Sequence, residues 1–73
     1  MNPAQLSKMV NDIAAFFASE SGEEKAVIDV AGHMQRFWDP RMRREIVAHY
    51  ARGGEGLSEL SMKAVAVLAR ASQ

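Results

Sequence analysis

Cysteine is absent from this chain of 73 residues, which excludes disulfide bonds and metal or cluster sites built on thiolates. Long apolar runs are absent too, and none approaches the roughly 20 residues that span a bilayer. The N-terminal stretch MNPAQLSKMVNDI also lacks the basic head and continuous apolar segment of a secretory signal. We therefore expect a cytoplasmic protein with no membrane segment.

The short length limits what the chain can stabilise by itself. A domain of this size buries only about 60% of the surface that its unfolded chain exposes. Much of the 48% apolar content is alanine, which adds little buried area per residue. The sequence therefore predicts a single domain, residues 1–73, and self-association of the isolated chain or docking on a partner is the remaining way to stabilise it.

An excess of charge of either sign is also missing, with nine basic and nine acidic residues. Residues 1–32 hold two basic residues against five acidic ones, and residues 33–73 hold seven against four. The chain is thus acidic in its first half and basic in its second. Overall balance argues against a general nucleic-acid partner, because such proteins carry a strong basic excess.

Capping signals predict the first two helices at about 3–19 and 22–37. Asn2 can cap the first helix, Pro3 suits its first position, and Met1 can pack against Leu6 as a hydrophobic staple. The stretch SGEE at 21–24 resembles a second capping box, with Ser21 as the cap and two acids in the first helical turn.

Similar signals place two further helices at about 40–52 and 59–71. Asp39 precedes Pro40, so the second helix closes there and Asp39 caps the third. Gly53 and Gly54 stop the third helix, and Ser58 can cap the fourth. No stretch alternates apolar and polar residues as a strand does. We predict an all-α fold, a small bundle of four short helices.

Each predicted helix carries one apolar stripe at helical spacing. Neighbouring residues on a helix point about 100° apart, so one aromatic of each adjacent pair is expected at the surface. The inward-facing residues are predicted to be Leu6, Met9, Val10, Ile13, Phe16 and Phe17; Val27, Val30, Ala31, Met34 and Phe37 or Trp38; Met42, Ile46, Val47 and Tyr50; and Leu60, Ala64, Val67 and Leu68.

Catalytic and metal-binding patterns are weak. Asp29 and His33 are four residues apart on one helix face, but two ligands do not make a metal site, and a surface pair explains them. The run GGEG at 53–56 lacks the preceding strand and the lysine of a phosphate-binding loop, and a helix stop explains it. We predict neither catalysis nor cofactor or metal binding by this chain.

The stretch RFWDPRMRRE at 36–45 combines two aromatics, a turn and four arginines. It can be a solvated face with Trp38 in the core and Asp39 acting only as a cap, or a docking face for an acidic partner. A third interpretation is a small DNA-binding regulator in which Arg41, Arg43 and Arg44 meet phosphates or bases, although this helix has few base-reading side chains.

Across the chain, the order of motifs resembles the delta subunit of the soluble NAD-dependent formate dehydrogenases of bacteria. The resemblance rests on IAAFFAS, on the Gly-Glu opening of the second helix, and above all on FWDPRMR at 37–43 and GGEGL at 53–57. It implies a non-catalytic accessory subunit of a cytoplasmic complex that interconverts formate and carbon dioxide. Such a subunit binds the large subunit and supports assembly, cofactor retention or stability.

The same resemblance assigns the cofactors to other chains. A large subunit would carry molybdenum or tungsten on a bis-pterin guanine dinucleotide together with iron-sulfur clusters, and further subunits would carry flavin and more clusters. The Asp39-Pro40 corner would hold aromatic and arginine side chains toward the large subunit. The predicted partner-binding residues are Arg36, Phe37, Trp38, Asp39, Pro40, Arg41, Met42 and Arg43.

Overall fold

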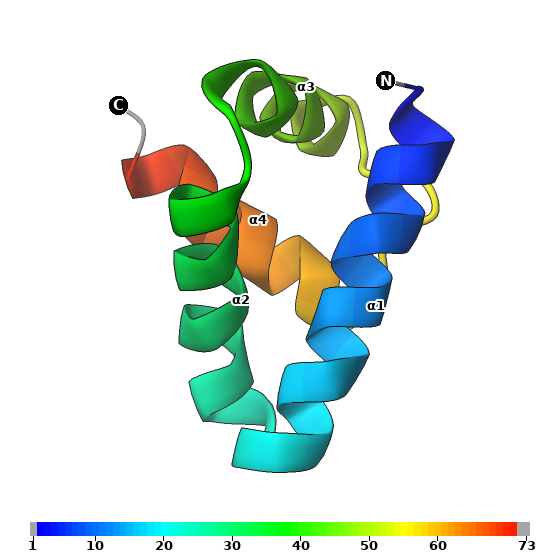
Figure 1. The fold of residues 1–73 in the computed structure, drawn as a ribbon. Helices are drawn as coiled ribbons and strands as arrows, with labels where there is room; N and C mark the ends of the chain where they lie inside the picture. The colour runs from blue at the N-terminus through cyan, green and yellow to red at the C-terminus, as the bar shows by residue number, and fades with distance from the viewer. Residues whose placement is uncertain (1, 72–73) are drawn as a thin grey trace.

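Four helices joined by short connections make up the molecule (Figure 1). In a computed structural model that describes residues 2–71, they are α1 (Pro3–Ser21), α2 (Glu23–Phe37), α3 (Pro40–Ala51) and α4 (Glu59–Ala71). The hairpin of α1 and α2 packs on α4, while α3 lies across one end and contacts α4 and α1. Residues 2–71 contain no strand, so the predicted all-α bundle of four short helices is confirmed.

The start of α1 follows its sequence signals, whereas the connection to α2 does not. Asn2 caps α1 by accepting hydrogen bonds from the backbone N–H groups of Ala4 and Gln5. The prediction that Ser21 caps α2 is wrong, because α1 continues through Ser21. Gly22, with a φ of 81°, ends one helix and begins the next without a side-chain cap.

The connection between α3 and α4 depends on glycine at one buried position. Gly54 has a φ of 65°, and a Cβ built there would collide with the sulfur of Met62. Its N–H donates to the carbonyl oxygen of His49 over 3.0 Å, which satisfies a carbonyl in the last turn of α3. Ser58 then caps α4 as predicted, because its hydroxyl accepts a hydrogen bond from the N–H of Ser61.

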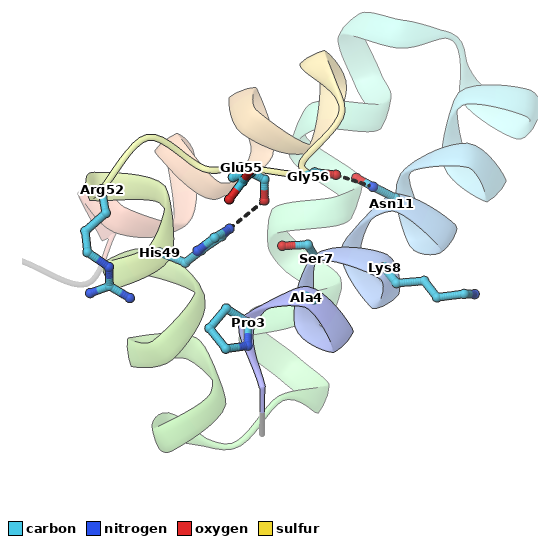
Figure 2. Close-up of a pocket in the computed structure, with 9 residues that line it drawn as sticks. All are labelled: Pro3, Ala4, Ser7, Lys8, Asn11, His49, Arg52, Glu55 and Gly56. Atoms are coloured by element: carbon cyan, nitrogen blue, oxygen red, sulfur yellow. Dashed lines mark hydrogen bonds between the residues drawn. The ribbon is translucent and has the colours of Figure 1, made fainter.

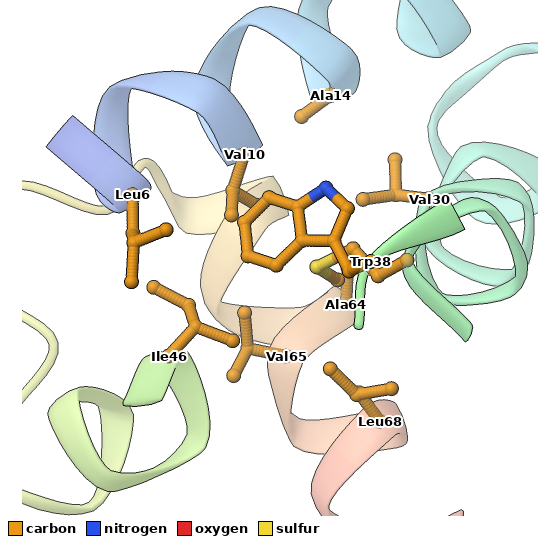
Figure 3. Packing of buried hydrophobic residues seen from close by; sticks show 10 residues of the cluster. Leu6, Val10, Ala14, Val30, Trp38, Ile46, Ala64, Val65 and Leu68 are labelled. Atoms are coloured by element: carbon orange, nitrogen blue, oxygen red, sulfur yellow. The ribbon is translucent and has the colours of Figure 1, made fainter. Parts of the chain in front are cut away.

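Buried side chains from all four helices form one core (Figure 3). Two predicted stripes shift by one or two positions, because Ala26 is buried more deeply than Val27, and Val65 is buried where Val67 was expected. The proposed packing of Met1 on Leu6 lies outside the described residues. The buried apolar residues are Leu6, Val10, Ala14, Ala26, Val30, Ala31, Met34, Trp38, Ile46, Ala64, Val65 and Leu68.

A polar link between α1 and the start of α4 closes the bundle. The side-chain amide of Asn11 donates to the carbonyl oxygen of Gly56 over 2.8 Å. Its carbonyl oxygen accepts hydrogen bonds from the N–H of Ser58 at 2.9 Å and the hydroxyl of Ser61 at 2.7 Å. One side chain thereby satisfies the buried Ser61 hydroxyl and two backbone groups of the connecting loop.

Over residues 2–71, no helix combines the length and the apolar character needed to cross a bilayer.

Candidate docking surface

The corner between α2 and α3 is built by residues of the predicted partner-binding cluster. Helix α2 ends at Phe37, and Trp38 and Asp39 adopt extended backbone conformations. The Asp39 carboxylate accepts a hydrogen bond from the N–H of Met42 over 2.9 Å, and Pro40 occupies the first turn of α3. Asp39 and Pro40 thus act as the capping pair that their sequence predicts.

Trp38 lies in the core, with 5% of its surface exposed (Figure 3). Its indole is surrounded by the core residues of all four helices, among them Val10, Val30 and Ile46. A side chain that is buried to this degree exposes almost no surface that could enter a pocket on a partner. Trp38 therefore occupies the core, as in the first interpretation of this stretch, and contact of its indole with a partner stays a prediction.

Arg43 also turns back onto the corner. One nitrogen of its guanidinium donates to the carbonyl oxygen of Gln35 over 3.2 Å and to that of Trp38. These two carbonyls lie at the end of α2, where the helix itself offers no donors. Met42 likewise packs against the core. Five of the eight predicted partner-binding residues therefore have roles within this chain: Trp38, Asp39, Pro40, Met42 and Arg43.

The basic face of α3 is smaller than its sequence indicates. Arg41 is mostly exposed and pairs with Glu45 at 3.5 Å, and Arg43 is engaged at the corner. Among the three arginines proposed to meet DNA, only Arg44 is exposed and forms no ion pair within residues 2–71. A contiguous basic recognition face is thus not presented by this helix.

The outward side of the same stretch forms an aromatic surface. Phe37 is 70% exposed and Phe16 is 60% exposed, so one member of each adjacent aromatic pair is at the surface as predicted. We define the aromatic surface as Phe16, Phe17, His33, Arg36 and Phe37. Exposed phenylalanine beside arginine is a composition enriched in protein interfaces.

Ring contacts run continuously across this aromatic surface, from α1 to α2. The ring centroids of Phe16 and Phe17 are 5.2 Å apart, those of Phe17 and His33 6.2 Å apart, and those of His33 and Phe37 4.9 Å apart. The Arg36 guanidinium lies 5.8 Å from the centroid of Phe37. Such contacts hold the rings in place before any partner binds, which lowers the entropy cost of binding.

A shallow groove of about 320 Å³ adjoins these rings. Asp12 and Ile13 of α1 complete its walls, together with Phe16, Phe17 and His33. The Nδ1 atom of His33 is buried here and has no hydrogen-bond partner in the part of the chain that the structure describes. The groove is therefore mainly apolar, with one carboxylate at its edge.

Sequence reasoning found Arg36 and Phe37 but missed the contribution of α1. The sequence pattern places Phe16 in a core stripe and predicts only a surface pair with Asp29 for His33. The available signals were the spacing of four residues between His33 and Phe37 and the adjacent Phe16-Phe17 pair. Which member of that pair turns outward depends on how α1 and α2 pack, which the sequence pattern does not specify.

A second pocket, of about 640 Å³, lies between the start of α1 and the end of α3 (Figure 2). Here His49 is hydrogen-bonded through Nε2 to the carbonyl oxygen of Glu55 at 2.7 Å. Lys8 points away from the pocket in this view and pairs with Asp12 at 3.0 Å. The Ser7 hydroxyl, which also lines this pocket, is buried and has no hydrogen-bond partner within residues 2–71.

Candidate metal ligands do not gather anywhere in residues 2–71: no three His, Asp or Glu side chains come together in a way that could hold an ion. Asp29 and His33 accordingly remain a pair on α2.

The model of a family described as the NADH-dependent formate dehydrogenase delta subunit FdsD matches residues 5–65. This range includes the corner, the whole aromatic surface and the connection between α3 and α4. No curated protein and no solved structure matches the chain.

Proposed function

Because the chain belongs to the family of delta subunits of NADH-dependent formate dehydrogenases, we propose that it is a non-catalytic accessory subunit of a cytoplasmic, NAD-dependent formate dehydrogenase complex. In this role it binds the large molybdenum-cofactor subunit and supports assembly, cofactor retention or stability of the complex. The family match over residues 5–65 is the observation that carries this proposal.

The proposal assigns the redox cofactors to the partner subunits. Iron-sulfur clusters need thiolate ligands, and this chain has no cysteine. The large subunit would carry molybdenum or tungsten on a bis-pterin guanine dinucleotide, and other subunits would carry flavin and clusters. The present chain would then act by binding: its folded surface would stabilise the large subunit in a form that can bind and retain its cofactors.

The aromatic surface is the part of the molecule best suited to this contact. Phe16 and Phe37 expose most of their rings, and burying such a side chain contributes roughly 1.5–3 kcal/mol. Arg36 beside Phe37 can bond to carbonyl or carboxylate groups at the rim of the contact. Of the residues predicted from sequence, Arg36 and Phe37 therefore keep a partner-binding role in this proposal, and the exposed Arg41 can contribute at its edge.

Co-expression tests the function directly. The partner subunits would be produced with and without this chain, purified through a tag on the large subunit, and assayed for co-purification and for molybdenum or tungsten per large subunit. We expect the chain to co-purify and its omission to lower metal content or activity. Unchanged metal content, activity and yield without the chain would refute an assembly or stabilising role.

Surface variants test where the contact lies. Replacing Phe16 and Phe37 by serine should lower co-purification by about tenfold or more, because exposed aromatic anchors dominate interface energies. Ile28→Ser is the matched control, since Ile28 is an apolar side chain of α2 that is 62% exposed but lies outside the aromatic surface. If the Phe16 and Phe37 variant co-purified as well as Ile28→Ser, the contact would lie on another part of the chain, and the family assignment would be unaffected.

A further inference from the structure

Helix α3 carries a second stripe of residues that does not face the core. Pro40, Arg44, Val47 and Ala51 are spaced by four, three and four residues, so they share one face of the helix. The core is contacted mainly by another face, which carries Met42, Ile46 and Tyr50, although Val47 touches its edge.

This second stripe forms one wall of a groove of about 720 Å³. The other walls come from Gln35 at the end of α2 and Ala71 at the end of α4, where α3 passes across the bundle. Apart from its two arginines, the side chains that α3 contributes are small or medium in size: Pro40, Val47, Ala48 and Ala51. Small side chains allow a second helix to approach closely, since interaxial distance depends on the residues at the contact.

The charges along the groove are all of one sign. Within residues 2–71, its charged lining residues are Arg43 and Arg44, and no Asp or Glu side chain lines it. Arg43 is held by the carbonyls of Gln35 and Trp38, which leaves Arg44 exposed and without an ion pair in residues 2–71. An apolar floor with an available guanidinium at its rim is complementary to an amphipathic segment that carries a carboxylate.

We propose that this groove binds an acidic amphipathic helix of a partner protein, which packs small apolar side chains on Val47, Ala48 and Ala51 and pairs a carboxylate with Arg44. Helix-in-groove binding of this kind uses anchors spaced three and four residues apart. The groove shares no lining residue with the aromatic surface, so the chain can engage two segments at once. This inference does not depend on which protein occupies the aromatic surface.

The test uses the full chain, labelled with ¹⁵N, and a designed helical peptide of about 15 residues with Ala and Leu on one face and Glu on the flanks. We expect saturable chemical-shift changes at Arg44, Val47, Ala48 and Ala51, and none from the same peptide with Lys in place of Glu. Shifts confined to other residues, or the absence of binding, would overturn the proposal.

Two pairs of variants sharpen this test. Arg44→Glu should lower the affinity for the peptide by about tenfold or more. Arg52→Glu, at an exposed arginine that lines the other pocket, should change that affinity by less than about twofold. Ala51→Trp should block the groove, and Ala15→Trp, at an exposed alanine of α1, is its control. Circular dichroism would verify that all four variants fold.

Two further probes distinguish other occupants. If a DNA duplex bound with the same loss in Arg44→Glu while the acidic peptide did not, the groove would be a nucleic-acid site and the proposal would fail. If the groove resonances moved with protein concentration in the absence of peptide, and sedimentation showed dimers that Ala51→Trp abolished, the occupant would be a second copy of this chain.

Discussion

The α2–α3 corner and the aromatic surface meet in the stretch 36–45, yet adjacent residues of that stretch have opposite positions in the molecule. Phe37 is 70% exposed, and its neighbour Trp38 is 5% exposed. The helix ends between them, so Trp38 leaves helical geometry with a ψ of 138° and turns into the core. A cluster of aromatics and arginines in the sequence therefore does not by itself identify an interface. The end of a helix within the cluster can send one residue to the surface and its neighbour into the core.

A second difference concerns hydrogen bonding. At the corner, Asp39 and Arg43 bond to backbone groups that the ends of α2 and α3 leave free. On the aromatic surface, residues contact one another mainly through ring faces and edges. The comparison predicts that substitutions at the corner reduce the stability of the chain. Substitutions at the exposed Phe16 and Phe37 of the aromatic surface should affect binding and leave stability nearly unchanged.

The largest effect is expected from Trp38→Ala. Removing a buried indole leaves a cavity bounded by all four helices and should cost about 3–5 kcal/mol of unfolding free energy. For a domain this small, that loss is comparable with its total stability. Urea denaturation followed by circular dichroism measures it. Should the variant unfold at the same urea concentration as the parent, the placement of Trp38 in the core would be incorrect.

A smaller effect is expected from Asp39→Ala. This change removes the carboxylate that caps α3 at Met42, and loss of such a cap costs about 1 kcal/mol. Asp39→Asn is the matched variant, because asparagine retains a capping oxygen and should preserve most of the stability. The same denaturation experiment applies, and equal losses in the two variants would show that the negative charge matters more than the hydrogen bond.

The smallest change in stability is expected from Phe37→Ser. A side chain exposed to this degree loses little contact on truncation, so the unfolding free energy should change by less than about 0.5 kcal/mol. The same variant is expected to weaken partner binding. A loss of binding without a loss of stability would distinguish the aromatic surface from the corner. A loss of stability as large as that of Trp38→Ala would mean that Phe37 supports the core.

Most of the fold could be predicted from the sequence because its helix ends carry strong local signals. Asn2, Asp39 and Ser58 each cap a helix as their positions indicate. The one failed cap, at Ser21, has a physical reason. Gly22 can adopt a positive φ, so α1 continues to the glycine and the turn needs no side-chain cap.

The candidate site was less predictable, because it depends on contacts between helices. The stretch 36–43 was identified, but a sequence pattern does not tell whether an arginine bonds to solvent, to a partner or to its own backbone. Arg43 bonds to the carbonyls of Gln35 and Trp38, and Phe16 joins Phe37 on one surface only through the packing of α1 on α2. Both facts arise from tertiary structure.

The Asn11 link also has a consequence for the order in which the chain folds. Its hydrogen bonds join residues that are 45 to 50 positions apart, whereas the helix caps join residues two or three positions apart. Closing a loop of that length lowers the conformational entropy of the chain before the stabilising contact forms. Local helices and turns therefore form more readily than this link. The attachment of α1 to the start of α4 should thus be among the last contacts to form during folding and among the first to open in the native state.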